Sequence, residues 1–184
     1  MKHHRRASLL LAATLLLVPF SIPAVISFAG AEIRSDGDTA WQDAGTLERL
    51  AEVLEQWLDR NSPYPRNGNP VTIRQVAPAQ VSRLTTRPSR TGLMPRGYYD
   101  PDSAEILLVA PWSLHDAHDV SVLLHELVHH RQQVAGHWYC PGAQELPAYR
   151  LQDKWLAERR LAARVNWIAV ILESGCARRD IHPE

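Results

Sequence analysis

The stretch SVLLHELVHHRQQ, Ser121 to Gln133, places three histidines and a glutamate inside an otherwise apolar run. Its leucines and valines supply a face that packs in a protein interior, so we expect a buried helix. On a helix, His125 and His129 stand one turn apart on the same face, where both imidazoles can bind one metal ion. Glu126 lies about 100° further round the helix, where it can act on a water without being a ligand. The bare pattern HELVH also occurs in proteins that bind no metal, so other parts of the chain must decide its meaning.

A zinc ion that catalyses hydrolysis takes three protein ligands and keeps one position open. Three residues compete for the third place. His137 follows the motif closely, Asp153 lies well inside the last predicted helix, and Glu145 stands at the start of that helix. A loop before Glu145 can reverse the chain, and an antiparallel return brings this carboxylate beside the histidines. We therefore favour Glu145 over His137 and Asp153, and the absence of an evident fourth ligand favours a catalytic site over a structural one.

HELVH followed by ELPAY resembles the gluzincin arrangement of zinc metallopeptidases, in which a second helix supplies a glutamate ligand. The stretch from Tyr98 to Cys176 is similar to small exported members of that group. The resemblance implies a minimal zincin-like fold and one Zn²⁺ ion. It implies the metal ligands His125, His129 and Glu145, with Glu126 as general base. The chain departs from the pattern at Arg131, where these enzymes often have an apolar residue, and in its short spacing from the second histidine to Glu145.

Four further residues near the motif each have two interpretations. Tyr149, one turn after Glu145, is a candidate catalytic residue that orients a ligand or donates to an oxyanion, or else a half-buried packing tyrosine. Tyr139 and His137, on the loop between the helices, are weaker candidates for the same role. His130 points off the ligand face, which favours a surface or supporting histidine over a ligand.

The N-terminus predicts export. A basic cap with Lys2, Arg5 and Arg6 precedes an uncharged run that ends in the small-x-small sequence Ala29-Gly30-Ala31. These features are typical of a secretory signal peptide, which we assign to residues 1–31 with cleavage after Ala31. The alternative is an uncleaved N-terminal membrane anchor, because an uncharged run of about 25 residues is long enough to span a bilayer. We expect a periplasmic or secreted protein.

Cleavage would remove three of the 20 basic residues and none of the 20 acidic ones, leaving a net charge of about −3. Nucleic acid is excluded as an expected partner, because phosphate neutralisation needs a basic surface. We expect a peptide or protein substrate, a monomer, and no stable membrane association after cleavage.

Residues 32–184 predict one α+β domain with an N-terminal helix, a short twisted sheet of about three strands and the two metal helices. We expect the first helix over 39–59, a strand over 71–76, and a loop over 77–97 with a short strand near 81–85. Hairpin strands at 98–99 and 105–109 flank the turn signal at 100–103, and the second of them is either a peptide-binding edge or an internal strand. The metal helix should run from Ala117 to Val134, capped by Asp116 or Asp119. Helical sequence then extends over 144–174.

Two cysteines in an exported chain favour one disulfide, Cys140–Cys176, although two buried thiols are the alternative. A continuous helix of 30 residues would span about 45 Å, whereas bridged Cα atoms lie about 6 Å apart. We therefore predict a reversal between Glu158 and Asn166, with Asn166 capping a second helix. Core positions in this segment are predicted to be Trp155, Leu161, Trp167 and Ile171.

The function that these features predict is an exported zinc metallopeptidase that hydrolyses peptide bonds. The alternative is a non-catalytic domain that binds zinc, a peptide or an envelope partner.

Overall fold

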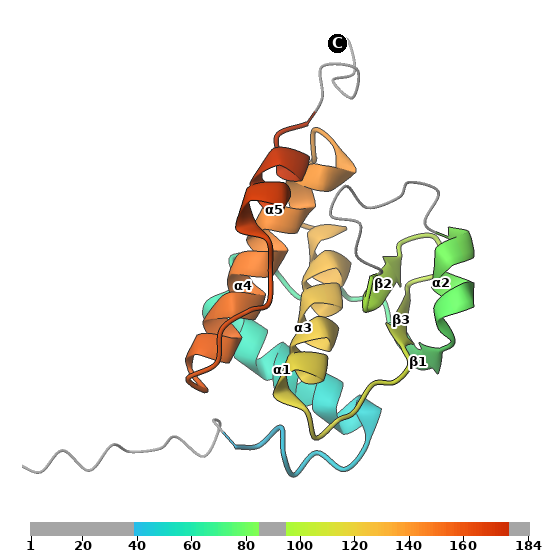
Figure 1. Ribbon diagram of the computed structural model, residues 1–184, viewed down its shortest axis with the longest axis vertical. Helices are drawn as coiled ribbons and strands as arrows, with labels where there is room; N and C mark the ends of the chain where they lie inside the picture. Colours follow the sequence, from blue (N-terminus) through green and yellow to red (C-terminus); the bar gives the residue numbers. More distant parts are fainter. Residues whose placement is uncertain (1–38, 85–94, 177–184) are drawn as a thin grey trace, which may run out of the picture. The chain divides into compact units, whose positions relative to one another are not determined.

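A computed structural model describes residues 39–84 and 95–176, all within one unit of the chain, residues 34–184. The predicted signal peptide lies outside the described residues. The elements are α1 (Leu47–Asn61), β1 (Thr72–Val76), α2 (Pro78–Leu84), β2 (Gly97–Asp100), β3 (Glu105–Val109), α3 (Ala117–Gln132), the 3-10 turn η1 (Pro141–Gln144), α4 (Glu145–Ala157) and α5 (Trp167–Ser174) (Figure 1). The described residues therefore form an α+β fold with five α-helices and a three-stranded sheet, which confirms the predicted fold class at this level.

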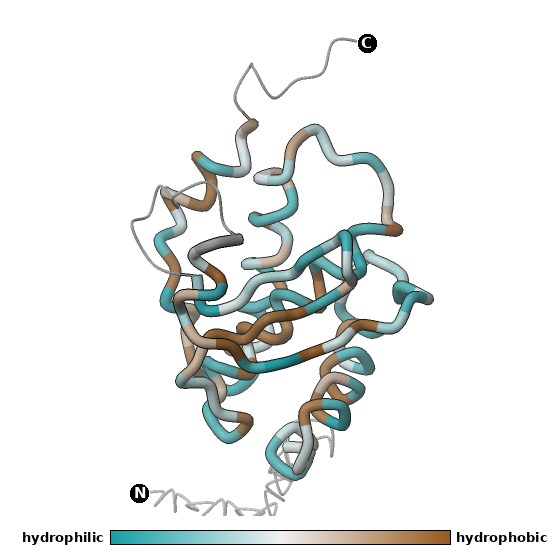
Figure 2. Tube along the Cα trace, turned by 90° about the vertical axis from the view of Figure 1, so that its right-hand side faces the viewer, coloured by the Kyte–Doolittle hydropathy of each residue, from teal (hydrophilic) through white to brown (hydrophobic). Residues whose placement is uncertain are grey.

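The sheet has the order β1-β3-β2, with β1 parallel and β2 antiparallel to β3. The central strand β3 has the sequence EILLV, and its last four residues are buried. A strand covered on both faces needs a continuous apolar run of this kind, and the hydrophobic residues of β3 stand out in Figure 2. Of the two interpretations of residues 105–109, the internal strand is correct. The edges of the sheet are β1 and β2.

Helix α3 is surrounded on all sides, by α1, α4, β2 and β3. Asp116 caps its N-terminus by accepting hydrogen bonds from the backbone N–H groups of His118 and Asp119. Leu123, Leu124, Leu127 and Val128 are fully buried, and the polar residues from His125 to Gln132 are buried beside them. The apolar run that carries the histidines is thus the central helix of the domain.

Helix α1 begins later than predicted, at Leu47 instead of Thr39. Gly45 has a left-handed φ of 68°, which turns the chain before the helix. The Thr46 hydroxyl then accepts a hydrogen bond from the Arg49 N–H at 3.2 Å, as an N-cap does. Trp41 still reaches the core from the preceding turn, where its ring meets Trp155 edge-on at 5.6 Å.

Residues Pro78–Leu84 form helix α2, so the loop with a short strand predicted near 81–85 is wrong. Proline is favourable in the first turn of a helix because its missing N–H has no partner there anyway. Val81 is fully buried and packs with Val76, Leu107 and Val109 on one face of the sheet. The helical conformation of this segment therefore depends on burial against the sheet, which the local sequence does not reveal.

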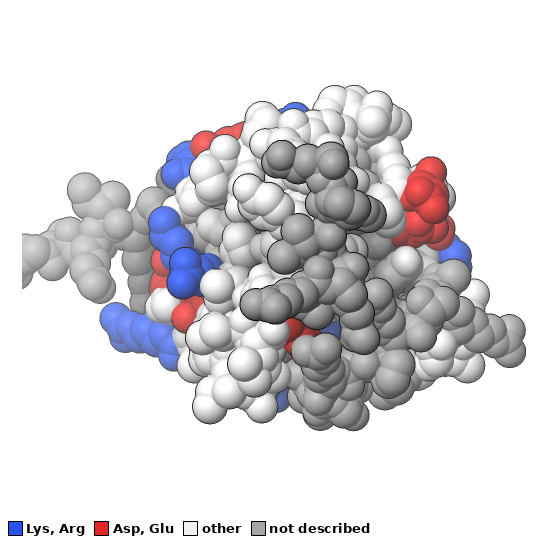
Figure 3. All heavy atoms as spheres, turned by 90° about the horizontal axis from the view of Figure 1, so that it is seen from above, with Lys and Arg blue, Asp and Glu red and all other residues white. Residues whose placement is uncertain are grey.

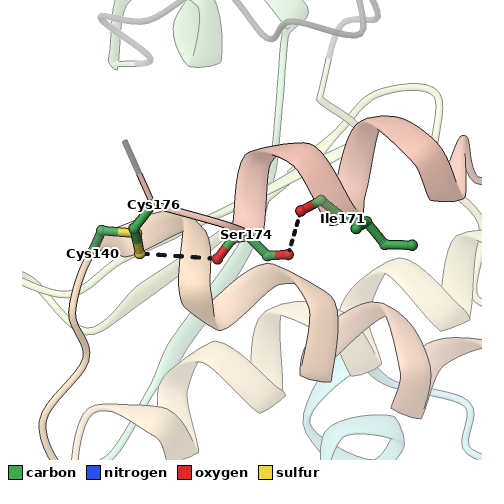
Figure 4. The surroundings of a disulfide bond; sticks show 4 residues. All are labelled: Cys140, Ile171, Ser174 and Cys176. Carbon is green, nitrogen blue, oxygen red and sulfur yellow. Dashed lines mark hydrogen bonds between the residues drawn. A yellow bond between two sulfur atoms is a disulfide. The ribbon is translucent and has the colours of Figure 1, made fainter. Parts of the chain in front are cut away.

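The predicted chain reversal and disulfide are both confirmed. Helix α4 ends at Ala157, and α5 begins after Asn166, whose side chain accepts from the Ala169 N–H at 3.2 Å. Cys140 and Cys176 are bridged, with their Cα atoms 5.9 Å apart, which joins the end of α5 to the loop before α4 (Figure 4).

The predicted core of this segment is only partly correct. Trp155 is buried, whereas Trp167 is half-buried and Leu161 and Ile171 are exposed by 38% and 55%. Helix α5 buries Val170 instead. This short helix packs against the rest of the domain through one of its faces. Within the described ranges, no helix has both the length and the apolar character needed to cross a bilayer.

The contacts of Arg131 explain why this chain has an arginine at a position where the resemblance implies an apolar residue. Its side chain is 1% exposed, and the guanidinium donates hydrogen bonds to the Glu55 carboxylate, the Asp59 carboxylate and the Tyr64 carbonyl. The same group also donates to the Glu55 carbonyl at 2.8 Å. Arg131 therefore fastens the end of α3 to α1.

Replacing Arg131 should show how much this attachment contributes. We expect Arg131→Met to lower the free energy of unfolding by about 3–5 kcal/mol, because the Glu55 carboxylate stays buried without its cation. Arg66→Met is the matched control, since Arg66 pairs with the same Asp59 but its side chain is 42% exposed. Its expected cost is below about 1 kcal/mol. Urea denaturation of both variants measures the difference, and equal losses would contradict the assignment.

Candidate metal site

Three ligand atoms converge between α3 and α4. The Nε2 atoms of His125 and His129 lie 3.0 Å apart. The Glu145 carboxylate oxygens lie 3.4 Å from Nε2 of His125 and 3.6 Å from Nε2 of His129. In a tetrahedral zinc site with bonds of about 2.0 Å, neighbouring ligand atoms stand about 3.3 Å apart. The two nitrogens and the two carboxylate oxygens therefore lie close to the spacing that one shared cation requires, and this group of three residues can hold a metal ion.

Helix geometry and chain reversal position these residues. His125 and His129 are four residues apart on α3, so both imidazoles leave the same face. Glu145 is the first residue of α4, directly after η1, and α4 packs along α3. The histidine side chains are 8% and 11% exposed, whereas that of Glu145 is 33% exposed. The site is therefore closed on the side of α3 and reachable beside Glu145.

The electrostatics of the group favour a positive charge between its members. Burial alone would raise the pKa of Glu145, but hydrogen bonds and charge from His125 and His129 outweigh it and hold that pKa well below its usual range. Burial likewise lowers the pKa of His129, yet the Glu145 carboxylate overcomes it and raises the pKa to about 9. The carboxylate thus stabilises a cation shared with the imidazoles, whether this is a proton or a metal ion.

The outer nitrogens of the two imidazoles differ in their surroundings. Nδ1 of His129 lies 2.8 Å from Oε1 of Gln132. Nδ1 of His125 is buried and has no hydrogen-bond partner among the described residues. The His125 ring instead packs against Tyr149, with ring centroids 4.4 Å apart.

Glu126 lies against the edge strand β2. It is 6% exposed, and the Tyr99 backbone N–H of that strand favours its charged form. Burial raises the pKa of Glu126, while the neighbouring histidines oppose the shift. Gly97 makes this position possible, because a Cβ atom there would lie 2.5 Å from the Glu126 carboxylate.

Tyr149 is placed beside the ligands, as its spacing from Glu145 predicted. Burial raises the pKa of its hydroxyl, and the charges of Glu145 and Glu126 raise it further. The phenol therefore stays protonated at neutral pH and keeps a proton to donate. Its catalytic role stays a prediction.

The competing candidates lie elsewhere. His137 is exposed on the loop, and the neighbouring Tyr139 is 74% exposed. The Asp153 carboxylate accepts a hydrogen bond from the Ala163 N–H at 3.1 Å, so it holds the turn after α4. His130 is 3% exposed, which excludes the predicted surface position. Its ring nitrogens contact the Tyr99 hydroxyl and the Asn69 carbonyl, each at 3.0 Å, so it supports β2 and the loop before β1.

Sequence reasoning missed Gly97 and Gln132. The spacing of Gln132 from His129, three residues on a helix, was an available signal because such residues are neighbours on the helix surface. Gly97 offered none, since a glycine at a strand end has many uses.

Fold and site together define a small α+β domain with a two-histidine, one-carboxylate group able to hold a metal ion. The chain belongs to the family described as "Domain of unknown function (DUF6647)", whose model matches residues 43–184. That match includes every residue of the site. Neither the curated proteins nor the solved structures contain a match to this chain.

Substitution of Gly97 tests the close approach of β2 to α3. We expect Gly97→Ala to lower the free energy of unfolding by about 1–3 kcal/mol, because the new methyl group overlaps the Glu126 carboxylate and Val122. Gly68→Ala is the control, since nothing lies within 4 Å of a Cβ atom at that position. Chemical denaturation compares the two variants. Equal stability of Gly97→Ala and the parent protein would show that Glu126 does not lie against this strand.

Proposed function

We propose that this protein is an exported zinc metallopeptidase, with His125, His129 and Glu145 as ligands and Glu126 as general base. The observation that carries the proposal is the convergence of two Nε2 atoms and one carboxylate at the edge lengths of a zinc tetrahedron. Three protein ligands leave one position for water or substrate, which is typical of catalytic and not of structural zinc.

The donor set favours zinc over the alkaline-earth ions. Two imidazoles and one carboxylate suit Zn²⁺, whereas Ca²⁺ and Mg²⁺ take mainly oxygen ligands. Zinc in such a site supplies Lewis acidity, which acidifies water and polarises a carbonyl.

The residues of the chain handle the proton. The Glu126 carboxylate takes a proton from the attacking water and gives it to the leaving amine. The Tyr99 N–H favours the charged form of this carboxylate, and the Tyr149 hydroxyl is the candidate donor to the developing oxyanion.

Among the described residues, no strand pairs with the outer edge of β2, so we propose this edge as the place for an extended substrate. Arg96 accepts a hydrogen bond from the Val109 N–H at 2.9 Å, so in this antiparallel register the backbone groups of Gly97 and Tyr99 point away from β3. A peptide that adds to this edge lies beside Glu126. We therefore propose β2 as the peptide-binding edge, in place of residues 105–109.

Three features support the wider proposal of a gluzincin-like, exported enzyme. The HExxH helix packs against an antiparallel edge strand and a following glutamate helix, in the order that the resemblance implies. The Cys140–Cys176 disulfide suits an oxidising compartment such as the periplasm or the extracellular medium. Figure 3 shows both basic and acidic residues on the face that it draws, and the sequence has 20 of each sign, which favours a peptide over a nucleic acid as partner.

Zinc binding tests the ligand set. The purified protein should bind one Zn²⁺ ion, measured by elemental analysis and by competition with a chromogenic chelator. We expect Glu145→Gln to weaken binding by at least 10–100-fold, because an amide oxygen carries no charge to balance the cation. His137→Gln is the control and should bind zinc as the parent does, because this histidine lies outside the site. A protein that binds no zinc, or in which His137→Gln is the weakened variant, would refute the ligand assignment.

Substitution of Glu126 separates an enzyme from a non-catalytic zinc protein. We expect Glu126→Gln to retain zinc and to lose at least 100-fold in the cleavage rate, because the amide has nearly the same size as the carboxylate but cannot take a proton. Cleavage is measured by mass spectrometry on a peptide library and on an unfolded protein. Glu52→Gln, on the exposed side of α1, controls for the loss of a carboxylate. If the parent protein cleaves nothing, or Glu126→Gln cleaves equally well, the non-catalytic alternative is preferred.

A further inference from the structure

Gln132 is the last residue of α3 and is fully buried. Its side chain touches both halves of the metal site. The carboxamide oxygen lies 2.8 Å from Nδ1 of His129, and the carboxamide nitrogen donates to the Gln144 carbonyl at 3.0 Å. Gln144 immediately precedes Glu145, so one side chain spans from a ligand on α3 to the start of the helix that carries the third ligand.

His129, Gln132 and Gln144 form a series of hydrogen bonds. The donor and acceptor roles in it follow from the Gln144 carbonyl. A backbone carbonyl can only accept, so the Gln132 NH₂ group must face Gln144 and its oxygen must face His129. An amide oxygen can only accept too, so Nδ1 of His129 must carry a proton. The remaining nitrogen of His129, Nε2, is then the one with a lone pair for a cation, and it is the atom that faces Glu145.

His125 has no equivalent support in the described part of the chain. Its Nδ1 atom is buried without a hydrogen-bond partner, and its ring is held by packing against Tyr149. Of the two histidine ligands, His129 is therefore the one that a hydrogen bond orients, through Gln132.

We propose that Gln132 is the positioning residue of the metal site, which sets the His129 tautomer with one end of its carboxamide and the start of α4 with the other. The proposal rests on the proposed zinc site. Gln132 touches no reacting group, and it acts by presenting two ligands at their mutual distance before a cation binds. Residues that orient metal-bound histidines in this way typically contribute 10–100-fold to affinity.

The test compares two buried glutamines that both bridge α3 and α4. Gln132→Met removes the proposed bridge at similar volume. Gln152→Met is the matched control, because Gln152 is 8% exposed and donates to the Ser121 hydroxyl at 2.9 Å without contact to a ligand atom. We expect Gln132→Met to weaken Zn²⁺ binding by about 10–100-fold, whereas Gln152→Met leaves it at the value of the parent protein.

A spectroscopic readout distinguishes positioning from general stabilisation. In the zinc-loaded protein, NMR should show a slowly exchanging, hydrogen-bonded Nδ1–H proton on His129. That signal should persist in Gln152→Met and disappear in Gln132→Met. A Gln132 that only stabilises the fold would affect the unfolding midpoint and leave the signal in place.

Gln132→Glu separates the two ends of the side chain and serves if Gln132→Met does not fold. Its carboxylate still accepts from Nδ1 of His129 but cannot donate to the Gln144 carbonyl. We expect the Nδ1–H signal to remain and zinc affinity to lie between those of the parent protein and of Gln132→Met. Loss of the signal in Gln132→Glu would overturn the tautomer assignment.

The outcomes identify which proposal fails. If the parent protein binds no zinc, the proposed metal site itself is refuted. If the parent binds zinc and Gln132→Met is no weaker than Gln152→Met, the site stands and the positioning role of Gln132 is refuted.

Discussion

The metal site between α3 and α4 is built around two imidazole nitrogens of α3 that lie 3.0 Å apart. Two lone pairs at that distance repel each other unless a proton or a metal ion lies between them, and a buried cation in turn needs a nearby anion. Glu145 meets this need, but only because the chain turns back after α3. The 3-10 turn, the close approach of Gly142 to the Glu173 carbonyl and the Cys140–Cys176 bridge all hold that return in place.

Helix α3 carries more buried polar groups than a central helix usually does, and their partners lie in different directions. Arg131 turns to the acidic side chains of α1, His130 to the Tyr99 hydroxyl, and Glu126 to the Tyr99 backbone. Because each of these groups has a partner, their burial does not carry the full cost of desolvation. The same contacts fix the rotation of α3, and thereby the direction in which His125 and His129 point.

The disulfide has a second role in a domain of this size. It closes a loop with a sequence separation of 36 residues, and bridges over loops of such length typically stabilise by about 2–4 kcal/mol. Helix α5 benefits most, because Val170 is its buried residue while Ile168, Ile171 and Leu172 are 55–73% exposed. Covalent attachment thus holds a helix whose own apolar contacts are few.

Local sequence was sufficient for the features that depend on spacing along one element. The four-residue interval places His125 and His129 on one face, Asn166 caps a new helix, and the distance limit of a disulfide requires a reversal before it. Local sequence gave wrong predictions for the segment of Val81 and for the burial of Leu161 and Ile171. Whether an apolar side chain is covered depends on neighbours that are distant in the chain. The metal-ligating residue types and their order were therefore set by the sequence itself. Only the tertiary structure decided that Gly97 leaves room for Glu126 and that Gln132 reaches both ligand helices, because both depend on contacts across separate elements whose distances no linear pattern records.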